Sequence, residues 1–396
     1  MTRHLFFALF VVIALLVVAA VHGYLWVRLV RDTQLPAPWR QIGTWAIILL
    51  GASLPLGMVL TRGVPFPISR WVSLLPYIWM GTMVLAFFLL LGADLLRLIA
   101  GLALRLTGSA DQLVDPSRRL ALSRLVAGTV GLAATGLSGV AVGRALGAVE
   151  VRRVEVRLSR LPRPLDGFRI VQLTDLHLGL TLGREFVERV VEQVRGLGAD
   201  LVAITGDLVD GAPGHLRDEV APMARLAAPH GVFFVTGNHE YYSGAEEWMP
   251  VLEGLGIQVL RNERVAIERG GASFDLAGID DHNARDMAPG HGPDLVKALA
   301  GRDPATEVVL LAHQPRAVME ASGLDVGLVL AGHTHGGQLW PWNHLVRLQQ
   351  PYVKGLHRHG ESRTQIYVSQ GTGFWGPPMR LGTVCEITEI ILKAEG

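Results

Sequence analysis

The chain has 396 residues, of which 50% are hydrophobic and 18% charged, and its mean hydropathy of +0.34 is too apolar for an ordinary soluble enzyme. A formal net charge of +1 argues against nucleic-acid binding driven by bulk electrostatics. The single cysteine, Cys385, excludes an intramolecular disulfide framework and a cysteine-rich zinc site.

The apolar residues concentrate before residue 146, in stretches near the length needed to cross a bilayer. A hydrocarbon core of about 30 Å takes roughly 20 helical residues. Tryptophans lie near the ends of the stretches, as interfacial anchors do, and the stretches carry almost no ionisable residues of the kind that line a transport path. The sequence therefore predicts an all-α transmembrane anchor, residues 1–145, with about four helices: 5–27, 42–60, 71–91 and 125–143.

Residues 146–166 are interpreted as a linker with a lead-in strand. Residues 167–396 form a second domain, in which short aliphatic runs alternate with amphipathic segments. This alternation predicts an α/β layered domain. Its first helix is expected around Phe186–Val194, where valines recur at helical spacing. The strand candidates are "FRIVQLTD", "DLVAITGD", "GVFFVTGN", "FDLAGID", "EVVLLAH", "VGLVLAGH" and "QIYVSQG".

Polar clusters follow five of these strand candidates. In "LVLAGHTHGGQLWP" an aliphatic run leads into His333 and His335, whose side chains would share one side of an extended strand end. Each cluster alone fits an ordinary turn or a capped loop. Together, at the carboxyl ends of strands where open α/β sheets place ligands, they favour one shared metal site. The clusters are Asp175 and His177; Asp207 and Asp210; Asn238, His239 and Glu240; His313; and His333 and His335.

The ordered blocks D-x-H, G-D-x-x-D, G-N-H-E, H and G-H-x-H, from about Gly167 onward, resemble those of the calcineurin-like metallophosphoesterases. The longer segments "GFRIVQLTDLHLG", "GNHEYYSG" and "GHTHGGQLWP" are most similar to a bacterial membrane-associated phosphodiesterase branch. The resemblance implies a two-sheet sandwich flanked by helices. Because no block departs from the family pattern, it also implies an active metal-dependent phosphoric ester hydrolase.

The same resemblance implies two divalent metal ions. The ligands of one would be Asp175, His177, Asp207 and His335, and those of the other Asp207, Asn238, His313 and His333. Mixed imidazole, carboxylate and amide ligands suit Mn, Fe or Zn ions. The shared carboxylate of Asp207 would hold the two ions about 3.5–4 Å apart, the separation used for in-line displacement at phosphorus.

The implied mechanism uses a metal-bridging hydroxide as the nucleophile. His239 matches the family's candidate proton donor to the leaving oxygen. Asp210 and Glu240 are expected to orient the ligands from outside the coordination sphere. Four aromatic residues could line a substrate cleft, touch the bilayer or only anchor loops: Trp340, Trp342, Phe374 and Trp375.

The sequence thus favours a membrane-anchored, dimetal phosphodiesterase or phosphatase. The anchor suggests a lipid-linked phosphate or pyrophosphate as the substrate, although tethered enzymes also act on soluble substrates. Two alternatives stay open. One is a non-catalytic metal-binding interaction module on the same fold. The other is a nuclease, which the lack of a basic stripe with interleaved aromatic residues disfavours.

The charges of the loops do not decide the orientation of an integral membrane protein of this kind. The segment Ser117-Arg118-Arg119, ahead of Leu120 and the glycine-rich fourth stretch, resembles a twin-arginine export signal, which is read from the cytoplasmic side. A basic loop between two helices is the alternative. With four spans, the export-signal interpretation predicts an extracytoplasmic catalytic domain.

Overall fold

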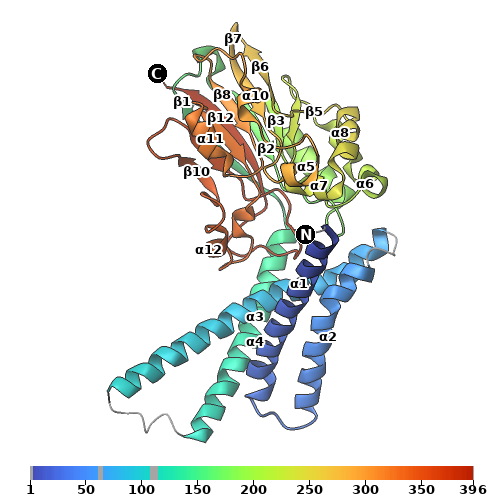
Figure 1. The fold of residues 1–396 in the computed structure, drawn as a ribbon, viewed down its shortest axis with the longest axis vertical. Coiled ribbons are helices and arrows are strands. Elements are labelled where there is room, and N and C mark those ends of the chain that lie inside the picture. Colours follow the sequence, from blue (N-terminus) through green and yellow to red (C-terminus); the bar gives the residue numbers. More distant parts are fainter. Residues whose placement is uncertain (1–2, 61–65, 108–114, 396) are drawn as a thin grey trace. The chain divides into compact units, whose positions relative to one another are not determined.

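The computed structural model describes residues 3–60, 66–107 and 115–395 (Figure 1). The chain divides into two compact units, Met1–Gly143 and Arg144–Gly396. Long helices make up the first unit. The second unit contains both β-sheets and a set of shorter helices.

Apolar side chains pack the helices of the first unit together. Its elements are α1 (Arg3–Trp26), the π-helical turn η1 (Val27–Arg31), α2 (Trp39–Leu60), α3 (Phe66–Leu106) and α4 (Pro116–Leu146), whose last turn enters the second unit. The buried cluster between them includes Leu25, Ile47, Met83, Ala86, Leu90, Val130 and Ala134. One residue or more from each helix therefore contributes to a common interior.

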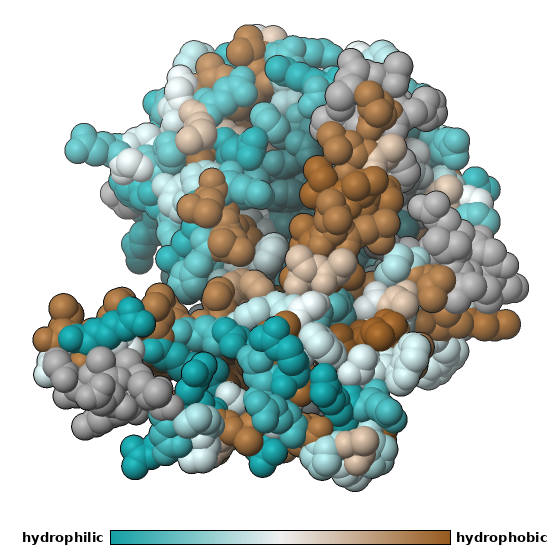
Figure 2. Space-filling model, turned by 60° about the horizontal axis from the view of Figure 1, so that its bottom comes forward, coloured by the Kyte–Doolittle hydropathy of each residue, from teal (hydrophilic) through white to brown (hydrophobic). Residues whose placement is uncertain are grey.

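The outward surface of these helices is apolar as well. Phe10, Leu49 and Leu132 are 64%, 65% and 79% exposed, the reverse of the pattern on a water-soluble bundle. Figure 2 shows large hydrophobic areas, in brown, on the face turned toward the viewer. A lipid environment accounts for such a surface, because it solvates apolar side chains.

Among the described residues, three helical segments are long and apolar enough to cross a membrane: Ala8–Arg31, Ile68–Leu106 and Pro116–Leu146. The predicted segment 42–60 does form a helix, α2, but it is not one of the three. The expectation of an N-terminal apolar helical anchor is confirmed, whereas the predicted count of four spans is not.

α3 is longer than its predicted span, 71–91, so that Asp94 lies inside the helix rather than just beyond it. Its carboxylate accepts hydrogen bonds from the Tyr24 hydroxyl at 2.6 Å and from Arg28 Nε at 2.9 Å. A charged group in a membrane helix is costly unless it is paired. These two partners provide that pairing.

The second unit is a sandwich of two six-stranded sheets, as the family resemblance implies. The first sheet contains, in spatial order, β1 (Glu150–Leu158), β12 (Glu386–Ala394), β2 (Arg169–Leu173), β3 (Leu201–Thr205), β4 (Val232–Val235) and β5 (Gln258–Val259). The second contains β10 (Gly355–Arg358), β11 (Gln365–Val368), β9 (Leu328–Ala331), β8 (Val308–Leu311), β7 (Ala272–Gly278) and β6 (Glu263–Arg269). All seven strand candidates are confirmed, as β2, β3, β4, β7, β8, β9 and β11.

Alternating side chains of the second sheet enter two cores. Leu328 and Leu330 of β9 join the core between the sheets. Val329 and Ala331, between them in sequence, join a separate core on the outer face of that sheet. The helices α10 (Leu295–Ala298) and α11 (Ala317–Gly323) cover this outer core. A strand buried on both faces explains why the run that leads into His333 is aliphatic throughout.

Helices follow the strands of the first sheet along the chain (Figure 1). α5 (Arg184–Gly196) is the predicted amphipathic helix, and it buries a face that includes Val187, Val190 and Val194. The remaining helices of the unit are α6 (Pro213–Val220), α7 (Asn238–Ser243), α8 (Ala245–Gly254), α9 (Ala284–Met287) and α12 (Asn343–Val346).

Candidate metal centre

Five loops carry the predicted site residues to the carboxyl ends of parallel strands. Asp175 and His177 follow β2; Asp207 and Asp210 follow β3; Asn238, His239 and Glu240 begin α7 after β4; His313 follows β8; and His333 and His335 follow β9. β2, β3 and β4 are mutually parallel, as are β8 and β9. Because parallel strands end at one edge of a sheet, each sheet delivers its loops to a single edge.

The first group of side chains that could hold a cation is Asp175, His177 and His335, all buried. Nε2 of His177 lies 3.0 Å from Nε2 of His335. The Oδ1 atom of Asp175 is 3.4 Å from His335 Nε2 and 4.0 Å from His177 Nε2. The three ligand atoms therefore converge, although they come from loops after β2 and β9 in different sheets.

The second group is Asp207, His313 and His333. Nε2 of His313 is 3.1 Å from Asp207 Oδ2 and 3.1 Å from Nδ1 of His333. The same Oδ2 atom is 3.7 Å from Nε2 of His177, a member of the first group. One carboxylate oxygen of Asp207 thus lies next to both groups.

Asn238 contributes an acceptor that no protein group satisfies. Its Oδ1 atom is buried and has no hydrogen-bond partner among the described residues. The next residue, His239, donates its main-chain N–H to Asp207 Oδ1 at 2.9 Å. Asn238 therefore lies next in the chain to a residue that contacts the second group. A buried acceptor without a donor costs about 1–3 kcal/mol. A cation bound there would satisfy it, and the amide therefore fits a metal site.

The backbone around these groups is held in an uncommon conformation. Five residues have positive φ angles between 49° and 71°: Asp175, His177, Asp207, His333 and His335. Such conformations cost roughly 1–3 kcal/mol each and persist where the surroundings enforce them, commonly at functional sites. Glycines make room beside them, since a Cβ at Gly237 or Gly332 would overlap the carboxylate of Asp207 or Asp175, respectively.

Hydrogen bonds to Nδ1 orient two of the imidazoles. Nδ1 of His313 lies 2.8 Å from the carbonyl oxygen of Thr205, to which it donates. Nδ1 of His177 lies 2.8 Å from Oδ1 of Asp210. A proton on Nδ1 leaves the lone pair on Nε2, the atom that faces the other ligands. In both rings Nδ1 is thus engaged as a donor, so that Nε2 is the atom that can bind a metal once it carries no proton.

The buried carboxylates and the nearby positive charges shift the pKa values of the histidines in the site. Burial alone would lower the pKa of His313, but the negative charge of Asp207 outweighs it and raises that pKa well above its ordinary value. Burial, together with the charge on His313, lowers the pKa of His333 to about 3. Burial and the nearby Arg380 likewise lower the pKa of His335 well below its usual range. The latter two imidazoles are therefore neutral, as metal ligands are.

His239 lies at the edge of the two groups and forms a third group of possible ligands with His177 and Asp210. Its Nδ1 atom is 2.7 Å from Oδ1 of Asp210, the oxygen that also contacts His177. The rings of Tyr242 and Trp375 approach it edge-on, with centroids 5.1 and 5.9 Å away. Burial opposes a proton on His239, but the charge of Asp207 and the hydrogen bond to Asp210 raise its pKa to about 9.

Glu240 supports the loop that carries Asp207. Its buried carboxylate accepts hydrogen bonds from the main-chain N–H groups of four residues: Asp207 at 2.9 Å, Leu208 at 2.7 Å, Val209 at 3.3 Å and Gly237 at 2.6 Å. Burial and the charge of Asp207 raise the pKa of Glu240 to about 7. Glu240 thus joins the loops after β3 and β4.

We predict that Glu240→Ala lowers the free energy of unfolding by at least about 3 kcal/mol, because several buried N–H groups lose their acceptor and each costs roughly 1–3 kcal/mol. Thermal unfolding of the full chain in detergent measures the change as a lower midpoint. Glu247→Ala, an exposed glutamate on α8, is the matched control and should leave the midpoint unchanged. Equal midpoints for the two variants would contradict the supporting role of Glu240.

Two residues near the site carry no sequence signal. The Thr174 hydroxyl donates to Oδ2 of Asp175 at 2.8 Å. The side chain of Arg380 is completely buried and donates from Nη1 to the main-chain oxygen of His335 at 2.8 Å. Arg380 also donates to the carbonyl of Gly373. It therefore fixes the loop after β9, although it lies 45 residues further along the chain.

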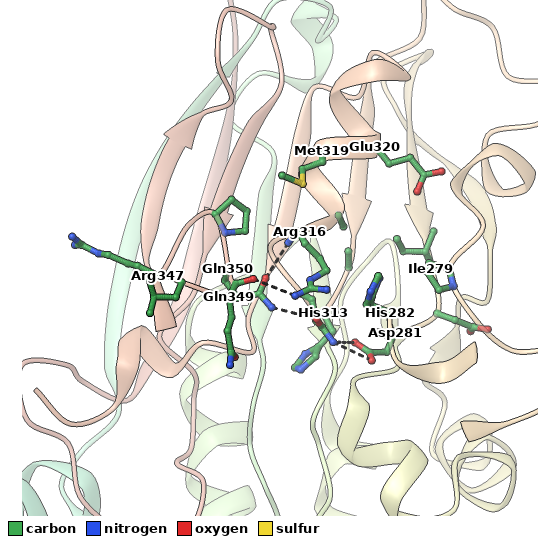
Figure 3. A pocket seen from close by; sticks show the side chains of 17 residues that line it. Ile279, Asp281, His282, His313, Arg316, Met319, Glu320, Arg347, Gln349 and Gln350 are labelled. Carbon is green, nitrogen blue, oxygen red and sulfur yellow. Dashed lines mark hydrogen bonds between the residues drawn. The ribbon is translucent and has the colours of Figure 1, made fainter. Parts of the chain in front are cut away.

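A cavity of about 540 Å³ adjoins the centre at His313 (Figure 3). Gln314 donates to both carboxylate oxygens of Asp281, at 3.2 and 3.0 Å. The Arg316 side chain donates to the carbonyl of Gln349 at 3.2 Å, while its Nε atom is buried without a hydrogen-bond partner among the described residues. The charge of Arg316 also contributes to the low pKa of His333.

The chain is similar to known metallophosphoesterases. A family model for calcineurin-like phosphoesterases matches residues 168–337. A transmembrane protein with metallophosphoesterase domain from Danio rerio is 37% identical over 385 residues, which cover 93% of this chain and 86% of that protein. Its namesake from Bos taurus is 42% identical over 308 residues, covering 75% and 68%.

A bacterial metallophosphoesterase is similar to this chain over nearly its whole length. An uncharacterized metallophosphoesterase from Campylobacter jejuni is 32% identical over 392 residues, which cover 98% of this chain and 99% of the bacterial one. The similarity therefore includes the apolar helices as well as the sandwich. On these grounds the chain belongs to the calcineurin-like metallophosphoesterases, a family of metal-dependent phosphoric ester hydrolases.

Proposed function

We propose that this chain is a membrane-anchored phosphoester hydrolase that works with two divalent cations. The proposed ligands are Asp175, His177, Asp207 and His335 for one cation, and Asp207, Asn238, His313 and His333 for the other. The observation that carries the proposal is the position of Asp207 Oδ2, 3.7 Å from His177 Nε2 and 3.1 Å from His313 Nε2. A single anionic oxygen between two imidazole groups is suited to bridging two cations.

When bound, the cations would stabilise charge on the phosphate oxygens and lower the pKa of an attacking water. The chain's own residues would do the rest. Asp210 holds Nδ1 of His239, which leaves Nε2 as the atom that can give a proton to the leaving oxygen. The pKa of His239, about 9, keeps the ring protonated, and nearby cations would lower that pKa toward neutrality.

The cavity beside His313 would hold the part of the substrate that is not transferred. Arg316 supports this role because its Nε–H, buried and without a partner, could bind an anionic oxygen. The helical anchor favours a lipid-linked phosphate or pyrophosphate as the substrate, since a tethered active site meets lipid substrates at high local concentration.

Hydrolysis by the purified full-length chain tests the proposal. We expect a nitrophenyl phosphodiester to be cleaved, EDTA to abolish the cleavage, and Mn²⁺, Fe²⁺ or Zn²⁺ to restore it with two metal equivalents per chain. A panel of phospholipids, lipid pyrophosphates and nucleotides would then identify the substrate class. Cleavage that survives complete removal of metal would refute the proposal, and metal binding without cleavage would favour the interaction module instead.

We further predict that the catalytic domain lies outside the cytoplasm, on the basis of the Arg118-Arg119 pair at the start of α4. Two fusions at the C-terminus measure this in a bacterial host. A fused alkaline phosphatase should be active, and a fused green fluorescent protein should show no fluorescence in the cytoplasm. The reverse pattern would place the domain in the cytoplasm without affecting the metal chemistry.

A further inference from the structure

Residues 340–348, which we name the apolar loop, expose large apolar side chains. They comprise α12 and the residues on either side of it. Trp340, Trp342, Leu345 and Leu348 are 53%, 47%, 42% and 82% exposed. Single exposed apolar residues are common, but four in nine residues form a local concentration that a water-facing surface avoids.

The backbone around the apolar loop is fixed, so the exposure is built into the fold. The N–H of Trp340 donates to the carbonyl of Leu381 at 2.9 Å. Just before the loop, Gln338 Nε2 donates to the carbonyls of Trp375 and Pro377 at 2.8 and 3.1 Å, and its Oε1 accepts from the Trp375 N–H at 3.1 Å. The aromatic Trp375, 56% exposed, is thereby tied to the same part of the surface.

The position of the apolar loop links it to the active site. Leu348 and Arg347 line the cavity that adjoins His313. The ring of Trp375 lies beside that of His239, with centroids 5.9 Å apart. The exposed apolar groups thus lie at the mouth of the site and not at the far end of the sandwich.

The apolar loop has the amino-acid composition of protein segments that lie at a membrane–water interface. Tryptophan prefers the headgroup level of a bilayer, leucine the region just below it, and arginine can extend its charge back to the headgroups. The apolar loop combines two tryptophans and two leucines with the exposed Arg347. Exposed apolar groups could bind a protein partner equally well, but a second feature of the chain favours lipid.

That feature is the covalent connection to the anchor. α4, one of the three apolar helices, ends at Leu146, and β1 begins at Glu150. The three residues between them span at most about 11 Å. The sandwich is consequently tethered to an apolar helix by a short link, and lipid is an apolar phase that stays near it.

We propose that the apolar loop inserts into the interfacial layer of the membrane that anchors the chain, so that the mouth of the metal centre opens at the lipid surface. The proposal does not depend on the hydrolase mechanism. It predicts that side chains 345 and 348 lie about 5–10 Å below the headgroup boundary, the depth typical of interfacial elements.

Site-directed spin labelling of the full chain in phosphatidylcholine–phosphatidylglycerol vesicles measures this depth. A nitroxide is attached to Leu348→Cys, and its collision rates with membrane-soluble oxygen and with an aqueous nickel chelate are compared. The native Cys385 is only 3% exposed, so the unsubstituted chain reports the background labelling. We expect oxygen to dominate at position 348, with a depth of about 5–10 Å.

Glu268→Cys is the matched control. Glu268 is exposed on β6, next to the turn that leads into β7. Because β7 is parallel to β8, this turn lies at the end of the sheet opposite the metal loops. Its label should collide mainly with nickel.

The result that overturns the proposal is a label at 348 as accessible to nickel as the label at 268. An immobilised label without oxygen preference would also overturn it, by indicating a protein partner. Leu345→Cys, a second exposed position, repeats the measurement if the first variant does not fold.

Discussion

Asp207→Asn should reduce hydrolysis to near background and lower the metal content below two equivalents per chain. An amide keeps the shape of the side chain but removes the negative charge that lets two cations lie close together. Loss of a group that only orients a ligand costs roughly 10- to 100-fold in activity or metal affinity. Loss of the shared ligand should exceed that range.

The geometry makes Asp207 the most sensitive position in the centre. Its Oδ2 atom approaches His313 and His177, and its Oδ1 accepts from the main-chain N–H of His239. Its pKa is held well below the ordinary value, because the charges of His313 and His239 outweigh the effect of burial. The carboxylate is thus ionised at neutral pH, and its substitution by an amide removes the charge.

Metal analysis and steady-state kinetics on the same preparations measure the effect. Asp218→Asn is the matched control, since Asp218 is an exposed aspartate on α6, and it should retain normal rate and metal content. If Asp207→Asn turned over at the rate of the unsubstituted chain with both metals bound, the two-cation centre would be untenable.

Local patterns in the sequence were sufficient to predict most of the candidate centre. Two His-x-His pairs show why. His333 and His335 follow the wholly buried strand β9, and the structure places them in the two ligand groups. His357 and His359 have the same spacing without such a strand before them. They lie at and beyond the edge strand β10, where His357 stacks on Tyr352 with centroids 4.7 Å apart.

Interactions between distant segments could not be predicted in this way. The pairing of β12 with both β1 and β2 depends on contacts more than 200 residues apart. Arg380 approaches His335 only because the loop after β11 turns back over the one after β9. No spacing rule connects two such positions. The fourth membrane span stays a prediction: α2 forms a helix where the span was expected, but among the described residues it is not one of the three segments long and apolar enough to cross a membrane.

His239→Ala should lose activity while keeping both metals. The ring belongs to neither the group that contains Asp175 nor the one that contains Asp207, but to a third group with His177 and Asp210, in which its Nδ1 atom contacts Asp210. Protonation of a leaving oxygen contributes roughly 10²- to 10⁴-fold to a rate. An alkyl phosphodiester, whose leaving group is strongly basic, should show a loss in that range. The metal content should match that of the unsubstituted chain.

The dependence on the leaving group separates proton donation from a positioning role. A nitrophenolate departs readily without a proton, so the loss with a nitrophenyl ester should be much smaller than with the alkyl ester. Tyr242→Phe removes a polar group from a ring that packs on His239 and serves as the control, with an equal and small effect on both esters. Equal losses on the two esters in His239→Ala, or loss of metal, would exclude the proton-donor role. His239 would then serve mainly to hold Asp210 in place, and the proton for the leaving oxygen would have to come from another group, such as a water in the cavity beside His313.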